Sequence, residues 1–254
     1  MGTIIQLQNA ALAYQSPDGE VEALRNITFR MEEGEFCSIV GPSGCGKSTL
    51  LGAIAGLEPL SGGSIIVDGE PVTAPSPKIG LMPQRDQLFQ WRTIWDNVTL
   101  GLSVRHQRTP ERLAHVRTLL ERYGLADFAA KQPCQLSGGM RQRCALIRTL
   151  ACDPRILLLD EPFSALDYQT RLSVSSDIYH IIRQEHKTAL LVTHDISEAI
   201  SMSDRVVVLS RRPAVVKTVL DLSPLRELDP LARRDSPLFP TYFNTIWKEL
   251  ELHA

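Results

Sequence analysis

The sequence contains no long apolar run. The aliphatic stretch at residues 156–159 is far shorter than the roughly 20 residues that a membrane-spanning helix needs. The opening residues 1–6 also lack the basic region and apolar core of a secretion signal. Together these absences predict a protein that stays in the cytoplasm.

Excess positive charge and paired cysteines are missing as well. The net charge is −2, so no general positive field favours binding to nucleic acid. The five cysteines form no C-x-x-C pair, and their odd number excludes a complete disulfide framework, as expected for a cytosolic protein. We interpret the two arginine pairs, Arg211-Arg212 and Arg233-Arg234, as solvated surface.

The first part of the chain has the pattern of strands, and no internal repeat is present. Residues 3–14 and 21–40 are typical of short strands separated by a turn at residues 16–19. The compact apolar run at 36–40 is followed by a glycine-rich loop and by helical character over 48–55. This order is the usual beginning of a parallel α/β nucleotide-binding sheet.

A helical segment interrupts this pattern between about residues 90 and 152. Apolar residues recur at helical spacing over 109–123 and 140–150, which predicts a helical lobe inserted into an α/β core. Further along, the patterns predict strands at 155–159, 189–193 and 205–209, a helix at 168–185, and a final amphipathic helix at 237–252. We expect the last helix to pack on the domain surface, with a partner or effector site as the alternative.

The strongest single motif is at residues 41–48, which match G-x-x-x-x-G-K-[ST] between a predicted strand and a predicted helix. Glycines allow successive backbone N–H groups to point at phosphate oxygens, and the positive end of the helix dipole assists. Lys47 supplies a full positive charge, and the hydroxyl of Ser48 can bind Mg²⁺. Cys45 is next to Lys47 and a helix start, which both favour a thiolate, so a reactive thiol is a hypothesis here; the alternative is a small side chain that the loop merely tolerates.

Two acidic residues follow the aliphatic run at 156–159. Such a run suits a central parallel strand, and its carboxyl end lies at the sheet edge where ligands bind in these folds. Asp160 is therefore a candidate Mg²⁺ ligand, and Glu161 is a candidate general base for the attacking water.

A third motif, Ser-Gly-Gly, stands at residues 137–139. Ser137 is a good N-cap for the predicted helix that follows. Gly138 and Gly139 leave backbone N–H groups open to an anion at that helix start.

In their order along the chain, these motifs and four further matches resemble the ATP-binding cassette family over about residues 3–210. The further matches are Gln84, the segment 164–167, His194 and Tyr14. The resemblance implies an α/β fold: a RecA-like P-loop NTPase core with an N-terminal antiparallel β subdomain and an inserted helical subdomain.

The resemblance also implies roles for individual residues. Tyr14 matches the aromatic that stacks on adenine, and Gln84 matches the loop glutamine that reaches Mg²⁺, water and the permease. His194 matches the switch histidine at the γ-phosphate, and Asp167 matches the loop that crosses the dimer seam. The expected catalytic residues are Glu161, His194 and Lys47; the expected metal ligands are Ser48, Gln84 and Asp160; and the expected ATP-binding residues are Tyr14, Gly41, Pro42, Ser43, Gly44, Cys45, Gly46, Lys47, Ser48, Thr49, Gln84, Ser137, Gly138 and Gly139.

We expect one domain over residues 1–254. Its catalytic core would comprise 1–89 and 153–225, its helical subdomain 90–152, and a C-terminal helical extension 226–254. In the family, ATP lies between Lys47 of one copy and Ser137 of a second copy arranged head to tail. The expected cofactors are ATP and Mg²⁺, and the expected place is the cytoplasmic face of the cell membrane.

One departure from the common family pattern and one further segment favour a subgroup. Met140 stands where many members have glutamine, and this variant resembles importers of nitrate, sulfonates and taurine. The segment 91–98 also resembles that group, although Gln90 replaces a common proline. The expected partners are permease subunits and, indirectly, an extracytoplasmic solute-binding protein, with no nucleic acid.

An ABC exporter or lipid transporter remains the alternative, because these transporters share the same ATP-binding and ATP-hydrolysing motifs with importers. DNA-acting ABC ATPases usually carry long coiled-coil insertions, and ribosome-acting ones typically hold two cassettes, whereas this sequence has neither. A non-enzymatic interaction module does not explain the presence of Lys47, Glu161 and His194 together. The solute itself is not encoded here, since selectivity belongs to the permease and the binding protein.

Overall fold

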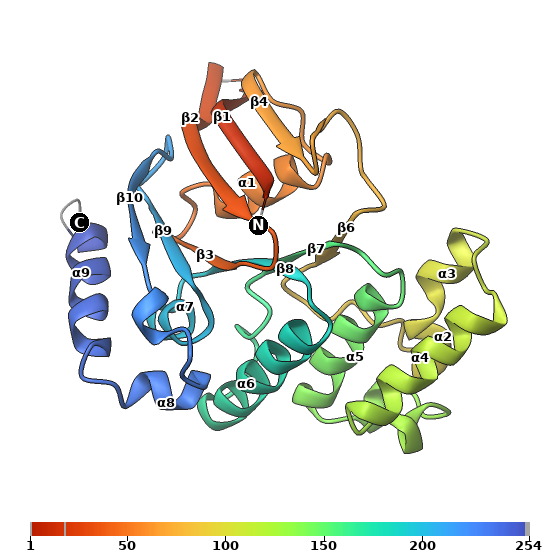
Figure 1. Ribbon diagram of the computed structural model, residues 1–254. Coiled ribbons are helices and arrows are strands. Elements are labelled where there is room, and N and C mark those ends of the chain that lie inside the picture. The colour runs from red at the N-terminus through yellow and green to blue at the C-terminus, as the bar shows by residue number, and fades with distance from the viewer. Residues whose placement is uncertain (1, 18, 252–254) are drawn as a thin grey trace.

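The computed structural model describes residues 2–17 and 19–251, and these residues form two sheets with helices around them (Figure 1). The antiparallel sheet has the order β2-β1-β4-β5, and the second has the order β10-β9-β3-β8-β7-β6. In the second sheet β10 alone runs antiparallel to its described neighbour. The strands are β1 (Thr3–Ser16), β2 (Gly19–Glu32), β3 (Phe36–Val40), β4 (Gly62–Val67), β5 (Glu70–Pro71), β6 (Ile79–Met82), β7 (Ile156–Asp160), β8 (Thr188–Thr193), β9 (Arg205–Leu209) and β10 (Val216–Asp221).

Seven of the helices lie in three places around these sheets. In Figure 1, α5 and α6 lie side by side below the second sheet, α2 to α4 lie together at one end, and α8 and α9 lie at the other. The helices are α1 (Lys47–Ile54), α2 (Ile94–Val98), α3 (Leu100–Val104), α4 (Pro110–Arg122), α5 (Gly138–Leu150), α6 (Tyr168–Gln184), α7 (Ile196–Met202), α8 (Pro230–Arg234) and α9 (Phe239–Glu251), with short 3-10 turns at Ala126–Phe128, Pro133–Gln135 and Ser223–Leu225. Among the described residues, no helix combines the length and apolar character needed to cross a membrane.

Most predicted elements are present, including strands in the range 21–40. Two strands occupy that range, and they belong to different sheets. The turn that separates β2 from β3 contains Gly34, whose φ of 76° lies in the left-handed region that favours glycine. Downstream, β3 is buried at every position, as a central parallel strand must be. Of the turn expected at 16–19, Ser16 ends β1 and Gly19 begins β2, while Asp18 lies outside the described residues.

The core has three parts. One apolar cluster fills the space between the two sheets around α1, and a second joins the parallel sheet to α2, α4, α5 and α6. A third lies between β9, α7 and the final helix α9, where Ile246 is fully buried. The final helix therefore packs on the domain surface as expected, although Leu252 lies outside the described residues.

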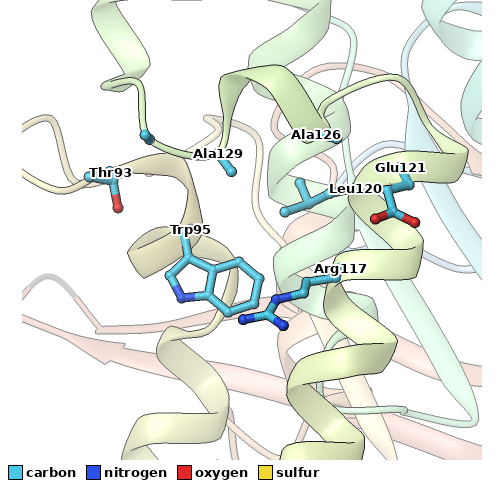
Figure 2. Close-up of a pocket in the computed structure, with 8 residues that line it drawn as sticks. Thr93, Trp95, Arg117, Leu120, Glu121, Ala126 and Ala129 are labelled. Carbon is cyan, nitrogen blue, oxygen red and sulfur yellow. The ribbon is translucent and has the colours of Figure 1, made fainter.

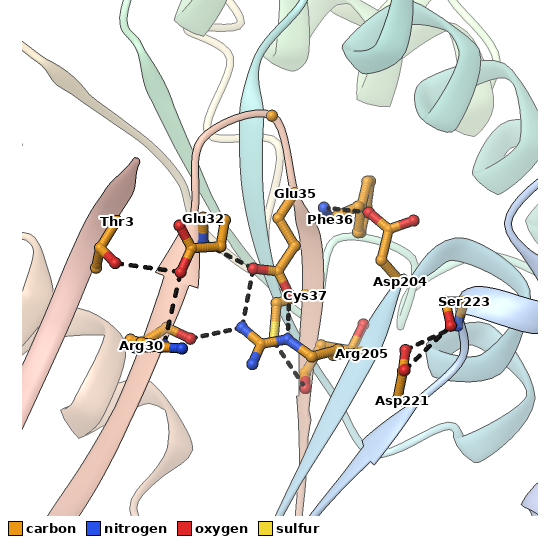
Figure 3. A network of polar contacts seen from close by, with 12 residues as sticks. Thr3, Arg30, Glu32, Glu35, Phe36, Cys37, Asp204, Arg205, Asp221 and Ser223 are labelled. Carbon is orange, nitrogen blue, oxygen red and sulfur yellow. Dashed lines mark hydrogen bonds and ion pairs between the residues drawn. The ribbon is translucent and has the colours of Figure 1, made fainter. Parts of the chain in front are cut away.

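A polar network joins the turn after β2 to β9 (Figure 3). The buried carboxylate of Glu35 accepts hydrogen bonds from the guanidinium of Arg205 and, at 2.8 Å, from the backbone N–H of Glu32. Arg205 also donates to the carbonyl of Arg30 at 2.5 Å. Because a buried charge is costly unless paired, this arrangement fixes how the antiparallel sheet meets the parallel one.

The interpretation of Arg233 as solvated surface is wrong, because this side chain is fully buried. Its guanidinium donates to the carbonyl oxygens of Ser203 at 2.6 Å and Leu228 at 3.1 Å, and it lies 5.6 Å from the centre of the Tyr179 ring. Burial lowers the pKa of the Arg233 guanidinium. The residue thus connects α8 to the ends of α6 and α7, a role that a short arginine pair in sequence does not reveal.

Replacing Arg233 tests this role. Arg233→Ala removes the donor from several buried carbonyl groups and opens a cavity, so we expect it to lower the free energy of unfolding by about 3 kcal/mol or more. The neighbouring, partly exposed Arg234→Ala is the matched control and should cost less than about 0.5 kcal/mol. Urea denaturation measures both, and equal effects of the two substitutions would contradict the structural role.

Candidate nucleotide-binding and hydrolysis site

The loop at residues 41–48 lies between β3 and α1, at the carboxyl edge of the parallel sheet. Gly44 and Gly46 both have positive φ angles, 71° and 120°. A Cβ at Gly46 would lie 3.1 Å from the carbonyl oxygen of Ala23, so the second glycine is also needed for close packing. Lys47 is 5% exposed, and its ammonium donates to the carbonyls of Gly41 and Pro42 at 2.9 and 3.0 Å.

The expectation of a reactive Cys45 is wrong. The side chain is 1% exposed, and its sulfur lies under Gly41, where an added Cβ would approach it to 2.8 Å. Burial raises the pKa of the Cys45 thiol, and the nearby charge of Lys47 opposes this without reversing it. The thiol is therefore protonated and shielded, which disfavours alkylation. Only the backbone of Cys45 can therefore take part in phosphate binding by this loop.

Ser48 and Asp160 meet at the same sheet edge. The hydroxyl of Ser48 donates to Asp160 Oδ1 at 3.0 Å, although the two residues stand on different strand–loop units. Burial raises the pKa of the Asp160 carboxyl, and the hydrogen bond from Ser48 opposes that change. A hydroxyl and a carboxylate oxygen side by side are the kind of hard ligands that Mg²⁺ prefers.

The carboxylate of Glu161 contacts two other expected site residues, His194 and Gln84. Its Oε2 lies 2.9 Å from Nδ1 of His194 and accepts a hydrogen bond from Nε2 of Gln84 at 3.4 Å. These three side chains follow β7, β8 and β6, whose carboxyl ends lie at one edge of the sheet.

The backbone of Glu161 is strained. Its φ is 42°, which is uncommon for a residue with a side chain, and its N–H donates to the carbonyl of Val192 at 2.8 Å. Strain of about 1–3 kcal/mol of this kind persists where the surroundings hold it, and it is concentrated at functional sites.

A cavity of about 290 Å³ joins the phosphate loop to this acidic edge. It is lined by Ser43, Gly44, Gly46, Lys47, Ser48, Thr49, Gln84, Glu161 and Arg212. The structure therefore brings Gln84 and Glu161, expected from separate motifs, to the phosphate loop. Arg212 was missed, because the sequence alone suggested a solvated surface pair.

Other expected residues lie outside this cavity. Tyr14 is at the end of β1, 38% exposed, and its hydroxyl donates to Thr49 Oγ1 at 3.4 Å. Ser137 caps α5 by accepting from the N–H of Met140, as predicted, and Asp167 caps α6 by accepting from the N–H of Thr170. Gly138 and Gly139 have a packing role as well, since a Cβ at Gly139 would approach the side chain of Val174 to 2.6 Å.

Two arginines of α5 hold the segment that follows Gln84. Arg141 pairs with Asp86 at 3.1 Å and donates to the carbonyl of Leu136 at 2.8 Å. Arg148 donates to the carbonyls of Asp86 and Gln87, both at 2.7 Å. The loop glutamine is thus attached to the helix that begins at Ser137.

A buried carboxyl lies behind His194. Glu198 is 4% exposed, accepts a hydrogen bond from Thr193 Oγ1 at 2.7 Å, and lies 3.8 Å from Nε of Arg171. Burial is the main reason that the pKa of Glu198 rises to about 7. Sequence reasoning missed this residue, because a single glutamate on a helix carries no signal of its burial.

This pKa makes stability depend on pH in a defined direction. The folded protein holds the Glu198 proton up to about pH 7, whereas the unfolded chain releases it near the usual glutamate pKa of 4.5. The free energy of unfolding should therefore fall as pH rises between these values and change no further above them. Glu198→Gln should lack this fall, and between pH 5 and 8 its stability should improve relative to wild type by about 2–3 kcal/mol.

Urea denaturation at a series of pH values measures this difference. The exposed Glu227→Gln is the control and should follow the wild-type curve. Parallel curves for wild type and Glu198→Gln would show that the Glu198 carboxyl titrates normally.

Comparison with known proteins places this geometry in context. A family model described as ABC transporter matches residues 24–164. The uncharacterized ABC transporter ATP-binding protein YtlC of Bacillus subtilis is 45% identical over 249 residues, covering 98% of this chain and 96% of that protein. The aliphatic sulfonates import ATP-binding protein SsuB of Bacillus cereus is 41% identical over 217 residues, covering 85% of each.

Solved structures agree with the sequence relatives. The dimeric structure of MJ0796, a bacterial ABC transporter cassette, has a TM-score of 0.73 and 32% identity, covering 86% of this chain and 99% of that one. A dimeric post-hydrolysis state of the same cassette, bound to ADP and Pi, has a TM-score of 0.71 and 30% identity with the same coverage.

Proposed function

Because this chain belongs to the ABC transporter family as an ATP-binding and ATP-hydrolysing subunit, we propose that it powers the import of a small anionic solute through a membrane permease. The solute class is that of nitrate, sulfonates or taurine. Support comes from the similarity to a sulfonate-import ATP-binding protein and from Met140 and the segment 91–98. In this proposal the chain works at the cytoplasmic face of the membrane, and an extracytoplasmic binding protein delivers the solute.

The observation that carries the hydrolytic part is the contact of Glu161 with His194 and Gln84 beside the phosphate loop. The Glu161 carboxylate accepts a proton from the attacking water, and His194 orients that carboxylate and contacts the terminal phosphate. Lys47 binds the phosphate tail. The side chain of Glu161, whose backbone is strained, lines this cavity.

A magnesium ion fits this site. Ser48 and Asp160 would hold it, with Gln84 within reach, while phosphate oxygens and water complete its shell. The described residues hold no cluster of three or more His, Cys, Asp or Glu side chains suited to a metal, which agrees with an ion that relies on few protein ligands. When bound, Mg²⁺ neutralises charge on the phosphates.

A second copy of the chain is part of the proposed mechanism. Ser137, Gly138 and Gly139 do not line the cavity beside Lys47. They form the start of α5, where backbone N–H groups and the helix dipole suit an anion. In a head-to-tail dimer they would close on the nucleotide held by the partner, and hydrolysis would release this attraction. The dimeric form of the similar cassettes supports this arrangement.

Glu161→Gln tests the catalytic role. The amide cannot accept the proton, so phosphate release should fall about 10²–10⁴-fold, while ATP-bound dimers persist on size-exclusion chromatography. Glu185→Gln, which changes a carboxyl held by Arg122 far along the chain, is the control and should keep its turnover. Normal phosphate release by Glu161→Gln would exclude Glu161 as the base.

A groove in the helical lobe suits the proposed permease contact (Figure 2). Its volume is about 480 Å³, and it is lined by Thr93, Trp95, Arg117, Leu120, Glu121, Ala126, Ala129 and Ala130. The Arg117 guanidinium lies 5.4 Å from the Trp95 ring centre, and the two side chains lie together in Figure 2. An apolar floor beside a cation and an acid is typical of grooves that receive a helix.

Hydrogen bonds connect this groove to the site. The side chain of Asn97 in α2 accepts from the N–H of Phe89 at 2.7 Å and donates to its carbonyl at 3.1 Å. The neighbouring Asp86 and Gln87 are held by α5, as described above. Movement of a permease helix in the groove would therefore shift the loop that carries Gln84, which couples transport to hydrolysis.

Trp95→Ala tests the groove. Loss of a central aromatic contact typically costs at least 2 kcal/mol, so co-purification with the permease should fall about 30-fold or more. Trp247→Ala, another tryptophan of this chain on the exposed side of α9, is the control and should retain the permease. Retention of the permease by both variants would place the contact elsewhere.

The solute and the direction of transport need the native permease. The complex, reconstituted with its binding protein, should take up nitrate, taurine or an alkanesulfonate when ATP is supplied on the side of this subunit. Export, or movement of lipid without such uptake, would favour the alternative transporter class.

A further inference from the structure

The turn between β9 and β10, at residues 210–215, lies against the phosphate loop. Ala214 is fully buried; its N–H donates to the carbonyl of Ala23, and its carbonyl accepts from the N–H of Arg25, both at 2.9 Å. A Cβ at Gly46 would lie 3.1 Å from that same Ala23 oxygen and 3.8 Å from the Ala214 side chain. The turn is therefore held in place beside the loop by β2.

This turn places Arg212 in the wall of the nucleotide cavity. The charged residues that line the cavity are Lys47, Glu161 and Arg212. Without Arg212, the ammonium of Lys47 is balanced by the carboxylate of Glu161. With Arg212, the wall carries a net positive charge, as a polyanionic ligand requires.

The guanidinium of Arg212 is available to a ligand. Within residues 2–17 and 19–251, no hydrogen bond or ion pair reaches its nitrogens, whereas Arg205 on the same hairpin is held by Glu35. A guanidinium offers five donors in a planar fork that matches the oxygens of a phosphate. The adjacent Arg211 is equally exposed but does not line the cavity.

We propose that Arg212 binds the phosphate tail of ATP, as a second cation facing the cavity alongside Lys47. This inference rests on the nucleotide site proposed above. The contact is one of ground-state binding, because Arg212 touches none of the groups assigned to the attacking water. The β9–β10 turn is then part of the nucleotide site. One arginine of the pair Arg211-Arg212, which the sequence suggested was solvated surface, has a binding role.

Equilibrium binding of Mg-ATP and of adenosine to the full chain tests the proposal, together with steady-state hydrolysis. Arg212→Ala should weaken ATP binding about tenfold and change adenosine binding less than twofold, since adenosine has no phosphate. Its KM for ATP should rise by more than its kcat falls. Arg212→Lys should recover part of the affinity at low salt, because it keeps the charge but loses the planar fork.

Arg211→Ala is the matched control, and it should bind ATP within twofold of wild type. Equal ATP affinity of Arg212→Ala and Arg211→Ala would overturn the proposal, as would an equal loss of adenosine and ATP binding. Lys47→Ala separates this result from a failure of the site as a whole. If Lys47→Ala bound ATP normally, the nucleotide site itself would be misplaced, whereas normal binding by Arg212→Ala alone removes only the role of Arg212.

Discussion

The hydrogen bonds that converge on the Glu161 carboxylate depend on one constraint, the common direction of β6, β7 and β8. Parallel strands end at the same edge of a sheet, so Gln84, Glu161 and His194 meet although they are far apart in the chain. The phosphate loop follows β3 at that edge as well. A reversed strand would remove its residue from the site, which is why the apolar cores that fix the sheet are also a condition of the chemistry.

The same edge is mechanically attached to the helical lobe. The segment after Gln84 is held by Arg141 and Arg148 of α5 and by Asn97 of α2. Each contact is a hydrogen bond to backbone or a short ion pair, so the segment cannot shift without exchanging partners. These hydrogen bonds therefore join the groove around Trp95, the segment after Gln84 and helix α5.

The fold and the phosphate loop could be predicted because their signals are contiguous. Eight consecutive residues specify the loop, and four aliphatic residues followed by two acids specify a strand and its edge. The contact of Gln84 with Glu161 needed the family resemblance, since Gln84 carries no local pattern of its own. Burial could not be predicted for single charged residues: Arg233 is fully buried and Glu198 nearly so, because tertiary carbonyl and hydroxyl partners compensate them. The hypothesis of a reactive Cys45 was wrong for a related reason. Its neighbours in sequence favour ionisation of the thiol, whereas its burial opposes ionisation.

The burial of Cys45 has a consequence for a cell under oxidative stress. Peroxides attack thiolates that solvent can reach, and Cys45 is neither ionised nor accessible beneath the phosphate loop. The one exposed thiol of the described residues, Cys134, lies in another part of the molecule, in the short turn before Ser137. Oxidants would therefore leave the phosphate loop unmodified. The protein would still bind ATP under conditions that inactivate enzymes with a solvent-accessible cysteine at this position.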